Sequence, residues 1–387
     1  MHKSVKDYEL LCLNLLKSGL WGTDIDDVEN FIDWNKVFKT AKSQSVLCVV
    51  GHAIFQIEWA AQSISQDLNA KFRSITVRNM VYGTSLERAL VKVVELLRDN
   101  GIEVVLLKGQ GNAQYYPEPS LRQCGDIDLY IGQDNFETAY DILKTVASEI
   151  DSKAELTIGK HFHMKIGTVC FDIHRFSGMY YLPRYNDKYH ETEIKGLTSN
   201  LKQIHFGNCL VNLPSNEFNA YYIFNHLFNH FLISGVGLRH LCDLMMFLHS
   251  NYGQLDQMEL KRILVRMGVL YPWRMIGGVL VDYLGLPSEE FPFYKKVSSR
   301  KTNIILRHIL PEGNFGFETD YYKRHNGSYL RSKFNALKWY VTRSFSIMLL
   351  FPRQAFRHLC NMIAMGISIV LNDLNKSSWN NGNQENC

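Results

Sequence analysis

Two aspartates in the middle of the chain, Asp126 and Asp128, have the type and spacing of metal ligands. They lie in the run 126–131, in which charged and apolar residues alternate as they do in a β-strand. Residues two apart in a strand project from the same face, with Cα atoms roughly 6.5–7 Å apart. Carboxylates so placed repel each other unless a cation lies between them, and oxygen ligands favour Mg²⁺ or Mn²⁺ over Zn²⁺. The pair therefore predicts a divalent metal site.

A third carboxylate, Asp172, lies between the apolar residues Phe171 and Ile173 of another expected strand. Alternation along that strand turns Asp172 away from its two apolar neighbours. We therefore expect Asp172 to lie on the same sheet face as Asp126 and Asp128. Three carboxylates on one face would complete a site for two metal ions.

The residues that precede the first aspartate have the composition of a phosphate-binding turn. The run 103–107 is short, rich in β-branched residues and bounded by glycines, which predicts a buried strand. A glycine-bearing turn after a strand lets backbone N–H groups approach a phosphate closely, above all where a helix begins. The predicted nucleotide ligands in this turn are Lys108, Gly109, Gln110 and Gly111. Lys108 has an alternative role, as a solvent-exposed cap of the strand.

The elements that must hold these residues form a small sheet between helical regions. Two pairs of alternating runs, 161–166 with 169–175 and 202–206 with 209–213, meet at two-residue glycine turns, which predicts β-hairpins. Apolar residues at helical spacing predict a helix over 134–147 and helices on both sides of the sheet. The predicted later helices are 218–233, 238–249, 258–267 and 273–284.

The sequence therefore predicts an α+β fold with a mostly antiparallel or mixed sheet. We expect a helical N-terminal region at 1–98, the catalytic α/β domain at 99–215 and a helical C-terminal region at 216–387. Asn100 and Gly101 provide a helix stop between the first two regions.

Composition excludes several classes of protein. Hydrophobic residues make up 46% of the 387 residues and charged residues 21%, so the chain can form a sizeable core. The net charge of +4 is too small to indicate a nucleic-acid-binding protein by itself. Eight cysteines without a CxxC pair argue against a zinc ribbon and favour unpaired thiols in a reducing compartment. No run reaches the roughly 18 apolar residues of a membrane span. We expect a cytoplasmic protein.

Taken together, these motifs resemble the nucleotidyltransferase superfamily of the DNA polymerase β type, and more narrowly a bacterial family of uncharacterised nucleotidyltransferases. The shared motifs are LKG at 107–109, Tyr-Pro at 116–117, Arg122, DIDL at 126–129, GVGLR at 235–239 and Asp243. The resemblance spans about residues 80–250. One departure is Gln110, which stands where the superfamily usually has a second small residue. Another is the long interval between Gly109 and Asp126.

The resemblance implies a two-metal active site. Asp126 and Asp128 would hold two Mg²⁺ or Mn²⁺ ions, while Asp172 would share one ion and activate the attacking hydroxyl. Two ions about 3.5–4 Å apart would stabilise the entering and leaving oxygens. The implied reaction transfers a nucleoside monophosphate from a nucleoside triphosphate, with ATP as the expected donor, to a hydroxyl of a small molecule, a protein or an RNA end. The alternative is a non-catalytic nucleotide-binding protein or a membrane-peripheral scaffold that retains the fold.

Several polar residues around this core have two interpretations. Arg122 and Arg239 either contact the nucleotide or form ion pairs, Arg122 with Asp126 or a neighbouring acid and Arg239 with Asp243 four residues later. A zinc site is one interpretation of a second group, which comprises His226, His230, His240 and Asp243. The surrounding phenylalanines favour the other interpretation, hydrogen-bonded histidines on a helix that faces the core.

The C-terminal segment 321–372 has an unusual charge distribution. It contains eight Lys or Arg residues and no Asp or Glu, and aromatic residues are interleaved with the basic ones. A basic, aromatic, amphipathic helix is typical of a membrane-surface segment, and the same composition suits RNA. The segment therefore indicates RNA or an anionic membrane surface as a partner, with a peripheral location at the inner membrane. The alternative is a solvated face over a helical core, built from two helices broken near Pro352.

Overall fold

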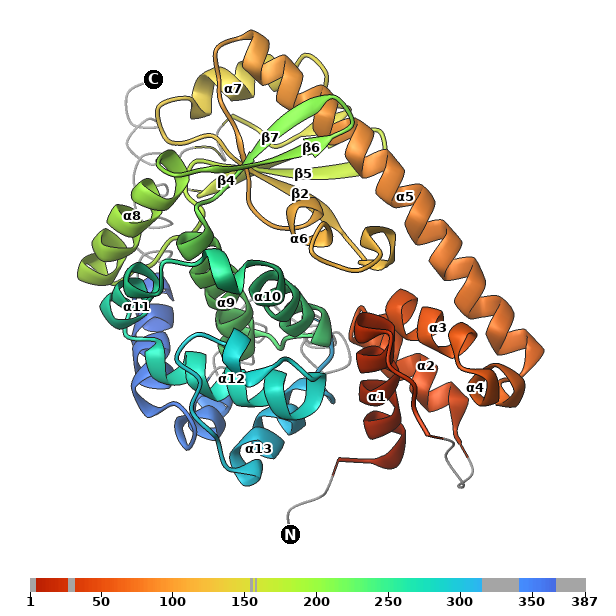
Figure 1. Cartoon of the computed structure of the whole chain (residues 1–387). Coiled ribbons are helices and arrows are strands. Elements are labelled where there is room, and N and C mark those ends of the chain that lie inside the picture. Colours follow the sequence, from red (N-terminus) through yellow and green to blue (C-terminus); the bar gives the residue numbers. More distant parts are fainter. Residues whose placement is uncertain (1–4, 27–31, 154–155, 157–158, 315–340, 367–387) are drawn as a thin grey trace, which may run out of the picture.

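The computed structural model of the protein describes residues 5–26, 32–153, 156, 159–314 and 341–366. Within these residues the fold is α+β, as the sequence predicts: a mixed seven-stranded sheet lies beside a larger group of helices (Figure 1). The sheet order is β3-β4-β5-β2-β1-β7-β6. Its strands are β1 (Val105–Leu106), β2 (Asp126–Tyr130), β3 (Glu149–Ile150), β4 (His161–Ile166), β5 (Val169–His174), β6 (Lys202–Phe206) and β7 (Cys209–Leu213).

The sheet is mixed because two of its pairings are parallel. β2 pairs with β5, and β1 with β7, in parallel, while the other neighbours are antiparallel. The turns of both predicted hairpins contain a glycine in the left-handed region, Gly167 (φ 60°) and Gly207 (φ 58°). Both hairpins are confirmed as β4–β5 and β6–β7.

Most of the chain is helical. The helices are α1 (Asp7–Trp21), α2 (Trp34–Ser43), α3 (Leu47–Gln56), α4 (Glu58–Ser63), α5 (Gln66–Asp99), α6 (Gln110–Ala113), α7 (Phe136–Leu143), α8 (Pro183–Thr198), α9 (Asn216–Ile233), α10 (Leu238–Asn251), α11 (Gln257–Arg266), α12 (Leu270–Leu284) and α13 (Ser299–Ile309). Two further helices, 341–348 and 352–366, are separated just before Pro352, where the sequence predicts the break. Because proline has no N–H and fixes φ, it suits the start of the second of these helices.

Helix α5 connects two hydrophobic cores. Near its start, Leu68 and Phe72 pack in a large core formed by α1–α4 together with α9–α13. Near its end, the side chains from Leu86 to Leu97 pack with one face of the sheet and with α7 in a second core. Figure 1 shows α5 running from the N-terminal helices up across the sheet. The other sheet face is thereby left to α6, α9 and α10.

The basic segment 321–372 is described only in part, since 321–340 and 367–372 lie outside the described residues. Two of its described arginines make internal contacts. Arg343 is buried, donates to the carbonyls of Leu232 and Phe231 and pairs with Glu312. Arg357 donates to the carbonyl of Met267 at 2.8 Å, and its guanidinium lies 4.0 Å from the centre of the Tyr185 ring. These two charges therefore fix the segment to the helical core.

Among the described residues, no single helix is both long and apolar enough to cross a bilayer. Only α11 and α12 taken together, bent by 118°, reach the required length and composition.

The seven cysteines in the described ranges are free thiols.

Candidate active site

Three aspartates converge on the sheet face that points toward α9 and α10. In the parallel pairing of β2 with β5, Asp128 lies directly opposite Asp172. Asp126 is two residues before Asp128 and therefore projects from the same face. Carboxylate oxygens of the three residues lie within 4.8 Å of one another. The predicted convergence is confirmed, while the catalytic roles of these residues remain predictions.

Asp128 is the most enclosed of the three acids. Its side chain is buried, and its Oδ1 lies 2.9 Å from Lys108 Nζ and 3.0 Å from His174 Nε2. Burial by itself would raise the pKa of this carboxyl, but Lys108 and His174 outweigh burial and hold the pKa well below its usual range. The same ion pair raises the pKa of Lys108 despite burial. Asp128 is therefore ionised and Lys108 protonated at neutral pH.

Asp126 has the opposite electrostatic character. Part of the residue is exposed, yet the surrounding protein removes enough water from its carboxyl group to raise the pKa. Repulsion from Asp128 adds to that effect, and attraction to Lys108 opposes it. A raised pKa means that the site resists a second negative charge. A bound dication would remove that resistance.

We expect Asp126→Asn to raise the free energy of unfolding of the metal-free protein at pH 7, by less than about 1 kcal/mol because solvent screens the carboxylate. The carboxyl proton of Asp126 is lost at a higher pH in the folded protein than in the unfolded chain, where the pKa is 3.8. Ionisation of Asp126 therefore lowers the free energy of unfolding at pH values above the folded pKa and has no effect below pH 3.8. Urea unfolding at several pH values measures the difference, which should vanish as the pH falls toward 3.8. A difference that is independent of pH would contradict this repulsion.

Histidines surround the third acid. His163, opposite Asp172 in the β4–β5 pairing, has its Nδ1 2.6 Å from Asp172 Oδ1. His161 Nε2 lies 3.9 Å from Asp172 Oδ2. Burial, followed by the charge of His174 and Lys160, lowers the pKa of His161 to about 3, so its ring is neutral at pH 7. Our sequence reasoning missed these residues, although the alternation of His161 and His163 in a predicted hairpin arm was an available signal.

The turn after β1 brings the backbone close to the acids. Gly109 has φ 55° and ψ −114° at the start of α6, and a Cβ there would lie 3.1 Å from the carbonyl oxygen of Asp126. Gly111 has a packing role, because a Cβ at that position would lie 3.0 Å from Leu213 Cδ2. Gln110 is buried, and within the described structure its Oε1 has no hydrogen-bond partner. Nucleotide contacts by these three residues remain predictions.

We expect Gly109→Ala to destabilise the protein by about 1–2 kcal/mol, because a side chain is strained at positive φ and would press on the Asp126 backbone. The matched control is Gly83→Ala in the middle of α5, where a Cβ meets nothing within 4 Å. That substitution should instead add up to about 1 kcal/mol, because alanine favours a helix. Chemical unfolding of both variants gives the comparison, and equal effects would contradict a constrained turn.

A buried ion pair corrects one of the predictions. Arg122 forms two hydrogen bonds of 2.7 Å with Asp243, and the Tyr116 hydroxyl donates to Asp243 at 2.8 Å. The predicted Arg239–Asp243 pair is therefore wrong: both oxygens of Asp243 accept from Arg122, and Arg239 donates to the carbonyl of Gln123 at 2.6 Å. Arg122 does form an ion pair, but its partner is Asp243 and not the predicted Asp126.

The segment from Ser120 to Gly125, which precedes β2, is held by α5. Asn79 donates to the carbonyl of Ser120 at 2.7 Å, and the Tyr82 hydroxyl donates to the carbonyl of Gly125 at 2.9 Å. These contacts fix the backbone immediately before β2. The position of Asp126 therefore depends on the long helix as well as on the sheet.

A small pocket lies over Asp126 and Asp128, and Asp172 is not among its lining residues. It is lined by Lys108, Gly109, Asn112, Arg122, Gly125, Asp126, Asp128, Ile223, His226, Arg239, His240 and Asp243. Arg239 Nε is buried without a hydrogen-bond partner in the described ranges, and burial lowers the pKa of this arginine. Two predicted phosphate ligands, Lys108 and Arg239, thus line the same pocket as Asp126 and Asp128.

The second histidine group lies on the helical wall of this region. The rings of His226, His230 and His240 are 4.5–5.6 Å apart between centroids. Within the described ranges, these three histidines do not bring their ligand atoms within 4.8 Å of one another. The structure thus does not support the zinc interpretation. Burial lowers the pKa of each ring, so the rings are neutral at pH 7.

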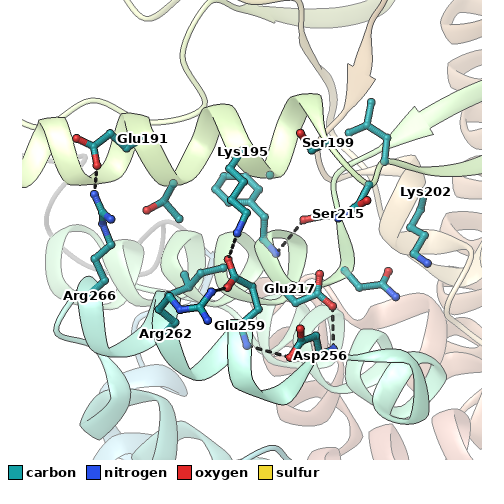
Figure 2. A pocket seen from close by; sticks show the side chains of 17 residues that line it. Glu191, Lys195, Ser199, Lys202, Ser215, Glu217, Asp256, Glu259, Arg262 and Arg266 are labelled. Atoms are coloured by element: carbon teal, nitrogen blue, oxygen red, sulfur yellow. Dashed lines mark hydrogen bonds and ion pairs between the residues drawn. The ribbon is translucent and has the colours of Figure 1, made fainter.

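A separate charged hollow lies between α8 and α11 (Figure 2). Its acidic and basic side chains neutralise one another: Lys195 and Arg262 both pair with Glu259, and Arg266 pairs with Glu191. Figure 2 shows two of these pairs, Lys195–Glu259 and Arg266–Glu191, bridging the two helices, while Arg262–Glu259 lies within α11. The hollow contains none of the three converging aspartates. Its charges therefore join helices, and we assign no reaction to it.

Comparison with known proteins identifies the family of the chain. No curated protein matches the chain. A solved structure described as an antigenic nucleotidyltransferase-like protein from Paracoccidioides brasiliensis is similar at 14% identity over 55% of this chain and 95% of its own, with a TM-score of 0.32. The model of the family described as uncharacterised nucleotidyltransferases matches residues 30–285, more than half of the chain and including all three aspartates. The chain therefore belongs to the uncharacterised nucleotidyltransferase family.

Proposed function

We propose that this protein is a metal-dependent nucleotidyltransferase of the DNA polymerase β type. It transfers a nucleoside monophosphate from a triphosphate, ATP in our proposal, to a hydroxyl group of an acceptor. The observation that carries the proposal is the convergence of Asp126, Asp128 and Asp172 on one face of two paired strands. Family membership supports the reaction class.

The donor set fits Mg²⁺ or Mn²⁺. All three acids offer carboxylate oxygens. Burial, and after it repulsion from Asp128, raises the pKa of Asp126, and a dication would favour the ionised form of this carboxyl. Asp126, Asp128 and Asp172 would hold the metal. When bound, the metal would neutralise charge on the triphosphate and stabilise the entering and leaving oxygens.

Lys108 and Arg239 are suited to bind the phosphates. Lys108 extends from the end of β1 to the buried Asp128, so its ammonium group is held at the acids before any substrate arrives. Arg239 lines the same pocket and has an unused buried Nε–H among its described contacts. Guanidinium and ammonium groups in a pocket with little water bind phosphate oxygens strongly and need little reorganisation.

Asp172 is positioned to take the proton of the attacking hydroxyl. Its Oδ1 lies 2.6 Å from His163 Nδ1, and the His163 side chain is 61% exposed. A proton accepted by Asp172 can therefore pass to the imidazole, whose other ring nitrogen lies 3.1 Å from His161 Nε2. In this arrangement His163 acts through Asp172 as a proton relay.

The acceptor side of the proposal rests on charge. The segment 321–372 has eight basic residues and no acidic one, which favours an anionic partner such as RNA or a membrane surface. Arg353 is exposed, whereas Arg343 and Arg357 are engaged with the helical core. We propose the cytoplasm, including the inner membrane surface, as the location.

Pyrophosphate release tests the proposal. The full chain is incubated with each of the four common triphosphates, Mg²⁺ or Mn²⁺, and a panel of hydroxyl-bearing acceptors. The proposal requires release that depends on metal and acceptor and that is lost on substitution of the acids. Triphosphate binding by calorimetry without turnover on any acceptor would favour a non-catalytic nucleotide-binding protein.

A further inference from the structure

A group of three histidines lies on the acidic face of the sheet, at the side where β4 pairs with β5. In this antiparallel pairing His161 lies opposite His174, and His163 lies opposite Asp172. Residues two apart in each strand share a face, so both partners of both pairs project toward the same side. The register of one hairpin therefore gathers imidazoles beside a carboxylate.

Both ring nitrogens of His174 face oxygen atoms. Nδ1 lies 3.3 Å from the carbonyl oxygen of Phe176, and Nε2 lies 3.0 Å from Asp128 Oδ1. Because both oxygens only accept, a neutral ring donates to one of them and leaves its other nitrogen as an acceptor. A metal ion bound at Nε2 would take the place of the proton that faces Asp128, while Phe176 would hold Nδ1–H.

The same arrangement is typical of a metal-binding histidine. A ligating imidazole usually donates its other N–H to a backbone carbonyl or a carboxylate, which fixes the ring and its tautomer. Phe176 supplies that carbonyl for His174. His174 is almost completely buried, so its ring is also fixed by packing.

His161 and Asp172 complete a ligand set with His174. Ligand atoms of these three residues lie within 4.8 Å of one another. Asp172 Oδ1 faces His163, whereas Asp172 Oδ2 is directed toward His161 Nε2, 3.9 Å away. In the described part of the protein the Nδ1 of His161 is buried without a hydrogen-bond partner.

We propose that His161, Asp172 and His174 form a mixed nitrogen–oxygen site for a transition-metal dication. Imidazole ligands favour ions such as Mn²⁺, Fe²⁺ or Zn²⁺ over Mg²⁺, which takes oxygen ligands. One metal position beside Asp172 is therefore selective for a transition metal, while the side of Asp126 and Asp128 offers carboxylate oxygens. The catalytic role of an ion at this site rests on the proposed function. Binding of the ion itself requires no nucleotide.

Pulsed electron paramagnetic resonance of Mn²⁺ tests this site. Mn²⁺ is added to the full metal-free chain without nucleotide, and nitrogen-14 modulation reports imidazole coordinated to the ion. We expect modulation in the wild type and its loss in the double variant His161→Gln/His174→Gln, with Mn²⁺ affinity lower by about tenfold to hundredfold. The matched control is His205→Gln, an exposed histidine of β6 in the same sheet, which should keep both. Mg²⁺ affinity should change much less.

The outcomes separate this site from the proposed function. Bound Mn²⁺ without nitrogen modulation, modulation that survives in the double variant, or no Mn²⁺ binding at all would overturn the histidine site. Pyrophosphate release with Mg²⁺ in the absence of modulation would leave the proposed function intact. Nitrogen modulation without turnover on any acceptor would support the histidine site and count against the proposed function. If the double variant does not fold, His161→Gln alone should weaken both the modulation and Mn²⁺ binding about tenfold.

Discussion

Asp128→Asn should lower the rate of pyrophosphate release by at least about a thousandfold. The carboxylate is buried, receives both Lys108 and His174, and lies opposite Asp172, so a neutral amide removes the charge around which the site is assembled. The loss of one preorganised electrostatic group in a site shielded from water typically costs two to three orders of magnitude, and the loss of a metal ligand costs more. The release assay with Mg²⁺ measures the effect.

Two further variants make this result interpretable. Asp134→Asn changes an exposed aspartate just beyond the end of β2 and should keep full activity. Asp126→Asn should lose activity although we expect it to be at least as stable as the wild type. If the Asp126→Asn protein is stable and inactive, unfolding is excluded as the cause of its own loss of activity. Activity within tenfold of the wild type in Asp128→Asn would refute the assigned site.

The largest effect on stability is expected from the buried ion pair between Arg122 and Asp243. Both side chains are at most 6% exposed and form two hydrogen bonds with each other. Removal of one partner leaves a buried charge without compensation, which typically costs about 3–5 kcal/mol. We therefore expect Arg122→Met to lower the free energy of unfolding by that amount. Urea unfolding monitored by tryptophan fluorescence gives the value.

The double variant Arg122→Met/Asp243→Leu is the critical comparison, because it removes both charges together. It should recover most of the lost stability, short of the hydrogen bond that Tyr116 donates to Asp243. As a surface control, Lys71→Ala breaks an exposed ion pair with Asp67 and should cost less than about 0.5 kcal/mol. A double variant no more stable than Arg122→Met would show that the two residues do not act as a pair.

The acidic face could be predicted from sequence because it depends on local alternation. The period of two in 126–131 and in 169–174 fixes which way each aspartate points once both segments are strands. The pairing of β2 with β5 then decides whether the two faces coincide, and the register sets Asp128 opposite Asp172. The glycine turns of the hairpins were equally local signals.

Contacts between distant residues were beyond such reasoning. Arg122 and Asp243 are 121 positions apart, and spacing within one helix suggested Arg239 as the partner of Asp243 instead. Helix α8 was not predicted because its inner face is not apolar: Thr192, Glu193 and Gly196 are among its buried residues. Strand β3 has two residues, too few to show a period.

The role of the histidines also depends on tertiary structure. The sequence shows that His161 and His163 alternate, but only the pairing of β4 with β5 brings them beside Asp172 and His174.

The predicted strand 103–107 contributes only Val105 and Leu106 to the sheet, because its pairing with β2 and β7 is limited to these residues. Lys108 lies two residues after the end of β1, and its ammonium group contacts Asp128 on the neighbouring strand β2.

The most direct test of the central claim is a crystal of the full chain grown with Mn²⁺ and a non-hydrolysable analogue of ATP. The proposed function requires anomalous density for Mn²⁺ within coordination distance of Asp126, Asp128 and Asp172, with the phosphates beside Lys108 and Arg239. Manganese bound elsewhere, with the triphosphate in the charged hollow between α8 and α11, would contradict it.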